Sequence, residues 1–171
     1  RRDLEQKKRT EISEAVGTGA IRFNIIRVAP DKGVTFRWEE ALSFDGDSAP
    51  FLMYAHARSC SIIRKITASG VELNSLDITL EIEDESKSFD DLVMMIADHN
   101  DVLERAVADH RPQTYARWAL DLAAGFNAFY RDCPILEDGQ INMNRAAACV
   151  LARNHLARAC WGLGLVPLEE M

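Results

Sequence analysis

Two side chains near the middle of the sequence have the types and spacing that could hold an unpaired nucleobase. Tyr54 and Arg58 are four residues apart, so on a helix they share one face. An aromatic ring can stack on a base while a guanidinium beside it contacts a phosphate. The same spacing also fits a tyrosine at the rim of a core and an arginine in a surface ion pair, so the pair alone leaves both interpretations open.

The sequence contains no pattern that indicates a catalytic or metal site. None of the four histidines stands at metal-ligand spacing from a second histidine or a cysteine: His56, His99, His110 and His155. Gly17 and Gly19 lack the third glycine and the strand–helix–strand setting of a phosphate-binding loop. We therefore expect no metal and no cofactor in this chain, and we do not expect it to be a complete enzyme by itself.

The composition is that of an ordinary globular protein. The chain has 171 residues, of which 47% are hydrophobic and 27% are charged, enough for one domain or one domain with an appendage. No apolar run approaches the ~20 residues of a membrane span, and no signal peptide opens the sequence, so we expect no membrane contact. The cysteines lack Cys-x-x-Cys spacing, which favours reduced core thiols in a cytoplasmic protein. They are Cys60, Cys133, Cys149 and Cys160.

The net charge of −7 is unevenly distributed along the chain. Residues 71–110 hold 2 Lys or Arg against 12 Asp or Glu, whereas residues 1–70 hold 12 against 9 and residues 111–171 hold 6 against 6. If the acidic stretch faces away, both flanks can approach a polyanion. The net charge therefore does not exclude a nucleic acid as partner.

The beginning of the chain is predicted to be a small mixed lead-in. Residues 1–15 are polar and indicate an exposed helix or a frayed end, which Gly17 and Gly19 stop. A tight turn is expected at Asp31-Lys32-Gly33, because glycine supplies the positive φ that such turns need. Val34–Trp38 then alternates apolar and polar residues, as a short strand does.

The rest of the chain is predicted to be an all-α helical bundle. Pro50 suits the first turn of a helix, Asp47 or Ser48 can cap it, and apolar residues at three- to four-residue spacing continue it to about Gly70. Further helices are expected over Phe89–Asp98, Asp101–Asp109, Gln113–Arg131 and Asn142–Trp161.

The connections between these helices carry their own signals. Residues 71–87 are expected to form an acidic loop with a short ordered patch at Leu76–Ile82. Ser88 is expected to cap the helix that follows. Pro134 and Asp138-Gly139 mark a loop before the last helix.

Several sequence blocks occur in a characteristic order. They are Val16-Gly17-Thr18-Gly19-Ala20-Ile21-Arg22-Phe23, Ser43-Phe44-Asp45-Gly46, Ala49-Pro50-Phe51-Leu52-Met53-Tyr54-Ala55-His56-Ala57-Arg58, Arg111-Pro112, Phe126-Asn127-Ala128-Phe129-Tyr130, Cys133-Pro134-Ile135-Leu136, and Gly162-Leu163-Gly164-Leu165 before a terminal Met171. In type and order these blocks resemble the C-terminal part of the arginyl-tRNA synthetases, over nearly the whole chain. The resemblance implies a connector at residues 1–45 and a helical anticodon-binding (DALR) domain at residues 46–171.

The resemblance also implies roles for individual residues. In that family the helix tyrosine, the arginine one turn later and the C-terminal methionine shape the pocket for the anticodon loop, and here they correspond to Tyr54, Arg58 and Met171. The usual glutamine and the usual aromatic hydroxyl of the run are replaced by Met53 and Phe51, which removes two hydrogen-bonding groups. Further candidates for phosphate contacts are Arg64, Lys65, Arg153, His155 and Arg158.

What the family does as a whole is only partly present in this sequence. The His-x-Gly-His motif and the Lys-Met-Ser-Lys-Ser-like loop that bind ATP in class I synthetases are absent. The resemblance therefore implies a tRNA-binding part of an arginine–tRNA ligase that uses ATP elsewhere and is inactive without the rest. We expect a monomer that binds the anticodon loop of an arginine tRNA.

Two alternatives remain open on the sequence alone. The chain could be a helical protein–protein interaction module that uses its acidic region at 71–110 to bind a basic partner. It could also be the equivalent bundle of a cysteinyl or bacterial glycyl synthetase. The run from Asp45 to Arg58 favours the arginyl family.

Overall fold

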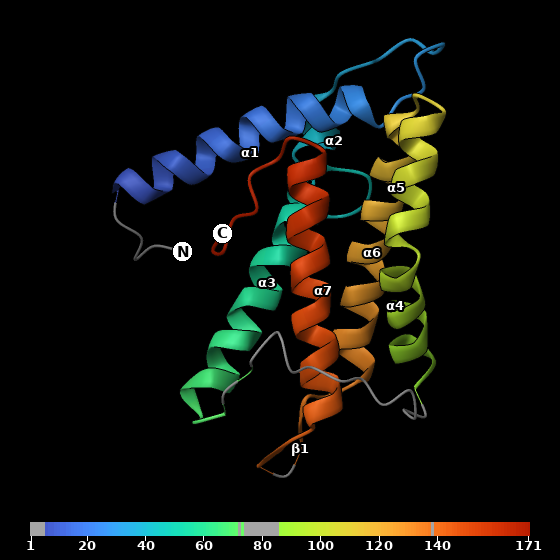
Figure 1. Ribbon diagram of the computed structural model, residues 1–171. Helices are drawn as coiled ribbons and strands as arrows, with labels where there is room; N and C mark the ends of the chain where they lie inside the picture. The colour runs from blue at the N-terminus through green and yellow to red at the C-terminus, as the bar shows by residue number, and fades with distance from the viewer. Residues whose placement is uncertain (1–5, 72, 74–85, 138) are drawn as a thin grey trace.

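The protein is a bundle of helices with one small hairpin (Figure 1). The computed structural model describes residues 6–71, 73, 86–137 and 139–171. In these residues the elements are α1 (Gln6–Ile26), α2 (Trp38–Ala41), α3 (Ala49–Ala68), α4 (Lys87–Ala97), α5 (His99–Ala108), α6 (Pro112–Asp132), β1 (Leu136–Glu137), β2 (Gln140–Ile141) and α7 (Met143–Gly162). The predicted all-α class is therefore confirmed. The ordered patch expected at Leu76–Ile82 lies outside the described residues.

Helices α3, α6 and α7 form the centre of the bundle, and α4 and α5 cover the far side of α6 (Figure 1). Helix α6 buries a stripe of aromatic side chains, which includes Trp118, Phe126 and Phe129. Helix α7 meets its neighbours through buried small side chains: Ala146, Ala148, Ala152 and Ala159. Small residues let helices approach closely, so the core combines large rings from α6 with short side chains from α7.

Helix α3 begins where its sequence predicts. The Ser48 side chain accepts a hydrogen bond from the Phe51 N–H at 3.2 Å and also donates to the Ser43 carbonyl, and Pro50 occupies the first turn. Gly46 precedes the cap with a φ of 90°, a backbone conformation that glycine adopts without steric cost. The cap therefore fixes both the start of α3 and the path of the chain into it.

The prediction that Gly17 and Gly19 end the first helix is wrong. Helix α1 continues through both to Ile26 and buries Ala20 and Phe23. A Cβ at Gly19 would lie 3.3 Å from Leu165 Cδ2 and 3.4 Å from Met53 Sδ. Gly19 is thus a position of close helix packing, and the burial of the neighbouring side chains outweighs its low helix propensity.

The strand predicted at Val34–Trp38 is also wrong. No other described segment pairs with it, and Trp38 begins α2. The Phe36 and Trp38 rings pack edge to face with centroids 4.7 Å apart, so the alternating pattern serves a local contact rather than a sheet. A turn does precede it, but it spans residues 29–32, where the Lys32 N–H donates to the Ala29 carbonyl at 2.9 Å, and Gly33 does not adopt the positive φ on which the predicted turn at Asp31-Lys32-Gly33 relied.

The two-stranded hairpin lies instead near the C-terminal half, where a loop was predicted. Leu136 pairs with Ile141 and Glu137 with Gln140 in an antiparallel register. Gly139 has a φ of 80°, which suits a tight hairpin turn.

The predicted cap of α4 (Lys87–Ala97) is two residues too late, because the N-cap is Ser86 and not Ser88. Helix α4 begins at Lys87 after Ser86, and the Ser88 hydroxyl donates to Asp132 Oδ2 at 2.6 Å. Ser88 therefore ties α4 to the end of α6 instead of capping its own helix.

The four cysteines are free and buried, as predicted. Burial raises the pKa of Cys149 and Cys160 to about 12. In the described part of the chain, no helix is long and apolar enough to cross a membrane.

Removing the α3 cap tests this account of the fold. We expect Ser48→Ala to lower the free energy of unfolding by about 1 kcal/mol, because the Phe51 N–H loses its acceptor. Urea denaturation followed by circular dichroism measures this. Ser13→Ala is the control, because Ser13 is exposed on α1 and its loss should change the free energy by less than about 0.5 kcal/mol. Equal stability of the two variants would contradict the capping role.

Candidate functional site

Tyr54 and Arg58 lie on the same edge of α3 and both reach the surface. Tyr54 is 40% exposed and Arg58 is half-buried. The Arg58 Cζ atom lies 4.3 Å from the centroid of the Tyr130 ring, and Arg58 Nη1 donates to Asn127 Oδ1 at 3.4 Å. The predicted pair therefore extends onto α6 through two residues that the sequence prediction did not include.

A second ring extends this surface at the other end. Phe44, in the segment before α3, packs edge to face against Tyr54 with centroids 5.9 Å apart. Phe44 is 52% exposed and Tyr130 is 38% exposed. We call the residues Phe44, Tyr54, Arg58 and Tyr130 the aromatic strip. Three partly exposed rings and one guanidinium follow one another along the α3–α6 edge.

Arg58 carries the positive charge of the aromatic strip. No carboxylate among the described residues forms an ion pair with Arg58. A guanidinium stacked on a ring contacts the ring through its own flat face. Its N–H groups lie in the guanidinium plane, so they remain able to donate to other groups. After the bond to Asn127, Arg58 still has donors for an oxyanion.

A pocket of about 510 Å³ adjoins the aromatic strip at Tyr130. It lies between the ends of α3 and α6 and the hairpin, with Ile62, Ile66, Ile135 and Ile141 among its walls. Two cations, Lys65 and Arg131, stand at this pocket. Arg131 is paired with Asp132 at 2.7 Å, and this hydrogen bond lowers the pKa of Asp132 to about 2.

Met171 is held beside α3 by the preceding tail. His56 Nδ1 lies 2.8 Å from the Leu168 carbonyl, and Arg64 donates to the Glu169 carbonyl at 3.2 and 3.3 Å. Met171 itself is half-buried against the core. The end of the chain lies between α1 and α3 (Figure 1). The structure thus brings Met171 to the helix that carries Tyr54.

The other residues that the sequence predicted as phosphate contacts lie on two helices, α3 and α7. Lys65 is exposed on α3, whereas Arg64 is used by the tail. The Nε of Arg153 is buried without a hydrogen-bond partner among the described residues, and its charge acts on His56.

His155 and Arg158 belong to a different part of the bundle. The His155 ring packs edge to face on His99 with centroids 5.3 Å apart, and His99 Nε2 lies 3.1 Å from the Tyr115 hydroxyl. The charge of Arg158 acts on this cluster. His155 therefore contacts α5 through His99 and is not brought to the aromatic strip.

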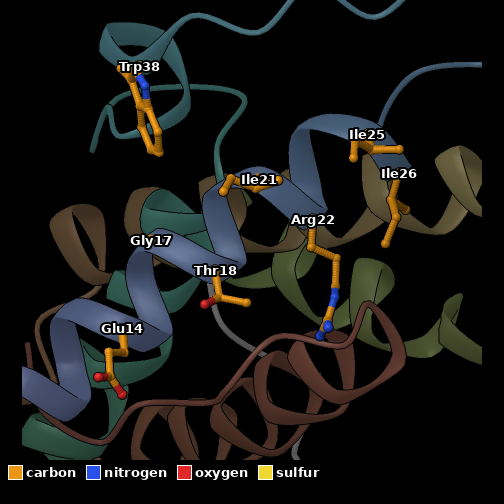
Figure 2. Close-up of a pocket in the computed structure, with 8 residues that line it drawn as sticks. All are labelled: Glu14, Gly17, Thr18, Ile21, Arg22, Ile25, Ile26 and Trp38. Carbon is orange, nitrogen blue, oxygen red and sulfur yellow. The ribbon is translucent and has the colours of Figure 1, made fainter.

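A second surface hollow lies on α1 and is apolar. Its walls include Ile21 and Ile25, and the Trp38 ring points toward α1 across the opening (Figure 2). The one arginine that lines it, Arg22, points away toward the tail, where it donates to the Gly164 carbonyl (Figure 2). This hollow lacks the free cation that distinguishes the aromatic strip.

In the described ranges, no group of three or more His, Cys, Asp or Glu side chains is arranged to hold a metal ion. His56 Nε2 and Cys60 Sγ lie 3.7 Å apart, but they are only two side chains.

The chain is similar to known proteins along nearly its whole length. Residues 52–171 match the family model of the DALR anticodon binding domain. The chain is 45% identical over 174 residues to the arginine–tRNA ligase of Thermococcus kodakarensis, and this match spans 99% of the chain and 27% of that protein. It is 38% identical over 171 residues to the arginine–tRNA ligase of Archaeoglobus fulgidus, spanning 99% of the chain and 30% of that protein.

A solved structure has the same fold. The arginyl-tRNA synthetase of Thermus thermophilus is 30% identical and superposes with a TM-score of 0.80, over 99% of this chain and 29% of that one. The chain therefore spans about 30% of the length of the curated relatives it matches.

The buried histidines make the stability of the fold depend on pH. Burial lowers the pKa of His56, His99 and His155 below the ordinary 6.5. Below that pH the unfolded chain takes up protons that the folded chain does not, so stability falls as the pH is lowered. We expect a lower melting temperature at about pH 5.5 than at about pH 7.5 in calorimetry.

Two variants separate this effect from other titrations. His99→Gln should flatten the pH dependence, because one buried imidazole no longer opposes protonation. His110→Asn is the matched control, since His110 is exposed and asparagine tolerates its φ of 54°. A melting temperature that rises on acidification, or equal slopes in both variants, would contradict the assignment.

Proposed function

Because the chain belongs to the family of DALR anticodon-binding domains, we propose that it binds the anticodon loop of an arginine tRNA through the aromatic strip. The observation that carries this proposal is the Tyr54–Arg58–Tyr130 arrangement, in which exposed rings flank a guanidinium that forms no ion pair within the described part of the chain. Unpaired bases are recognised by stacking on aromatic side chains and on guanidinium planes, with phosphates held by nearby cations.

The geometry supports different roles for the residues of the aromatic strip. Tyr54 offers a platform for one base, and Phe44 holds its ring by an edge-to-face contact. Tyr130 and Asn127 orient Arg58 so that its remaining N–H groups meet a phosphate. Lys65, about two turns beyond Arg58 along α3, adds a second positive charge on the same helix.

Met171 is proposed as an apolar wall for the same base. Its thioether is polarizable and its side chain is adaptable, so it can pack against a base edge without a hydrogen bond. The tail contacts to His56 and Arg64 support this placement.

The proposal extends to a longer protein. We propose that residues 46–171 are the binding unit, that residues 1–45 connect it to the rest, and that the longer protein joins arginine to its tRNA with ATP bound outside this chain. The chain alone is then expected to bind tRNA as a monomer and not to aminoacylate it. Its four free thiols fit a reducing cytoplasm.

Arginine tRNA is favoured over the tRNAs of the related bundles. The relatives described above are arginine–tRNA ligases, and the match to them includes the run from Asp45 to Arg58. The protein–protein alternative rests on the acidic stretch alone, and much of that stretch, residues 72 and 74–85, lies outside the described residues.

Affinity for an arginine tRNA transcript tests the proposed site. We expect Tyr54→Ala to weaken binding by about 5- to 150-fold, the range for loss of one base–aromatic stack. Arg58→Ala should weaken binding and also reduce the slope of log affinity against log salt by about 1, because one phosphate contact is lost. Filter binding at several salt concentrations measures both quantities.

Matched controls keep the result specific. Trp161→Ala removes an exposed ring and Arg37→Ala removes an exposed cation, both outside the aromatic strip, and neither should change affinity by more than about 2-fold. A transcript whose anticodon loop is replaced by a closed four-nucleotide loop should bind far more weakly. Equal binding of both transcripts, or unchanged binding by both strip variants, would contradict the proposal.

A further inference from the structure

We propose that His56 and Arg64 are positioning residues: they hold the C-terminal tail, residues 165–171, against α3 and so place Met171 at the RNA-binding surface. This inference rests on the proposed function for its RNA half, whereas the holding of the tail is a property of the protein alone. Neither side chain is then a direct RNA contact, and this gives Arg64 a different role from the phosphate contact that the sequence suggested.

The tail is turned back onto the bundle at the end of α7. Gly164 adopts a φ of 67°, and the Leu165 N–H donates to the Cys160 carbonyl at 2.8 Å. Leu165 is then buried beside Gly19 of α1, and the Arg22 guanidinium donates to the Gly164 carbonyl. The first residue of the tail is therefore fixed by a helix-terminating turn and a buried side chain.

His56 is oriented to donate a hydrogen bond to the tail. A carbonyl can only accept, so the 2.8 Å contact with the Leu168 carbonyl requires the proton on Nδ1. Nε2 is then the acceptor, and it faces Cys60 Sγ at 3.7 Å. His56 is buried on α3, and its burial lowers its pKa and favours this neutral form.

The next two tail residues are held in turn. Arg64 donates to the Glu169 carbonyl with both terminal nitrogens, and Lys8 of α1 forms an ion pair with Glu170 at 3.0 Å. Of the three contacts made by His56, Arg64 and Lys8, those of His56 and Arg64 are to backbone carbonyls, so they fix the path of the tail whatever its side chains are. Two helices thus hold three consecutive residues just before Met171.

Holding the tail matters because a loose tail must be ordered when RNA binds. Ordering each residue's backbone costs conformational entropy, and that cost opposes binding. From the anchored Leu168, Met171 can lie no further than about 11 Å along the chain, whereas a tail free from residue 165 could place it more than about 20 Å away. The anchors therefore order the tail during folding, and binding does not have to.

Paired variants at His56 test whether the hydrogen bond to the tail is what matters. His56→Ala removes the donor, whereas His56→Asn retains an N–H close to the position of Nδ1. We expect His56→Ala to weaken binding of an arginine anticodon stem-loop by about 2- to 12-fold, the range for one hydrogen bond, and His56→Asn to restore most of the loss. Fluorescence anisotropy measures the affinities.

Introducing His56→Ala into a chain that already carries Met171→Ala distinguishes a positioning role from a loss of binding that does not act through Met171. If His56 acts by placing Met171, His56→Ala should cause little further loss once the methionine side chain is gone. An equal fold-loss in both backgrounds, or no rescue by asparagine, would overturn the positioning role. Arg64→Ala should behave like His56→Ala, and Lys65→Ala, on the neighbouring exposed residue, should show the same loss with or without Met171.

A measurement without RNA tests the anchoring of the tail separately from the proposed RNA binding. Release of Met171 by carboxypeptidase should be several-fold faster in His56→Ala and Arg64→Ala than in the unsubstituted chain or His56→Asn, at equal folded content by circular dichroism. Unchanged release rates would overturn the anchoring of the tail. If release accelerates as expected but the unsubstituted chain binds no stem-loop, the proposed function fails and the RNA half of this inference fails with it.

Discussion

The burial of α3 is the constraint on which the rest of the structure depends. Leu52, Met53 and Ala55 lie in the core, α1 approaches the helix closely at Gly19, and α6 and α7 pack along its other sides. A helix enclosed in this way keeps only a narrow exposed edge, and on that edge Tyr54 is the prominent side chain. The position of the binding surface therefore follows from the packing of the bundle.

That constraint also links the two ends of the chain. Because α1 and α3 lie side by side, a tail leaving α7 can be bound by both, through Lys8 and Arg22 on one helix and His56 and Arg64 on the other. The acceptors are mostly backbone carbonyls, which need donors wherever the chain is partly buried. Satisfying these carbonyls brings the end of the chain next to the helix that carries the aromatic strip.

The helices of the bundle could be predicted from the sequence because their period, caps and prolines agree. The errors arose where tertiary contacts override local signals. Gly19 reads as a helix stop, but its missing Cβ lets α1 approach α3. Val34–Trp38 has a strand period without a partner strand among the described residues.

The candidate site, too, could be predicted where it depends on local structure and not where it depends on tertiary contacts. Tyr54 and Arg58 could be paired from their spacing, because a helical turn is a local property. Tyr130 could not, because only the packing of α3 on α6 places its ring under Arg58. Tyr130 follows Phe126 by four residues, so its spacing alone predicts a buried position and gives no signal of the exposed ring that the structure shows. His155 looked equivalent to the other cations in the sequence, yet its contacts belong to the His99 side of α7.

Methyl NMR of the methionines tests the central claim most directly, because the chain has five and they report on different surfaces. Met94 and Met143 are exposed on α4 and at the start of α7, Met53 is in the core, and Met171 is beside α3. On addition of an arginine anticodon stem-loop, we expect the Met171 methyl resonance to shift while those of Met94 and Met143 stay in place. A bound stem-loop that leaves Met171 unchanged, or that shifts Met94 instead, would contradict an RNA site on the exposed edge of α3.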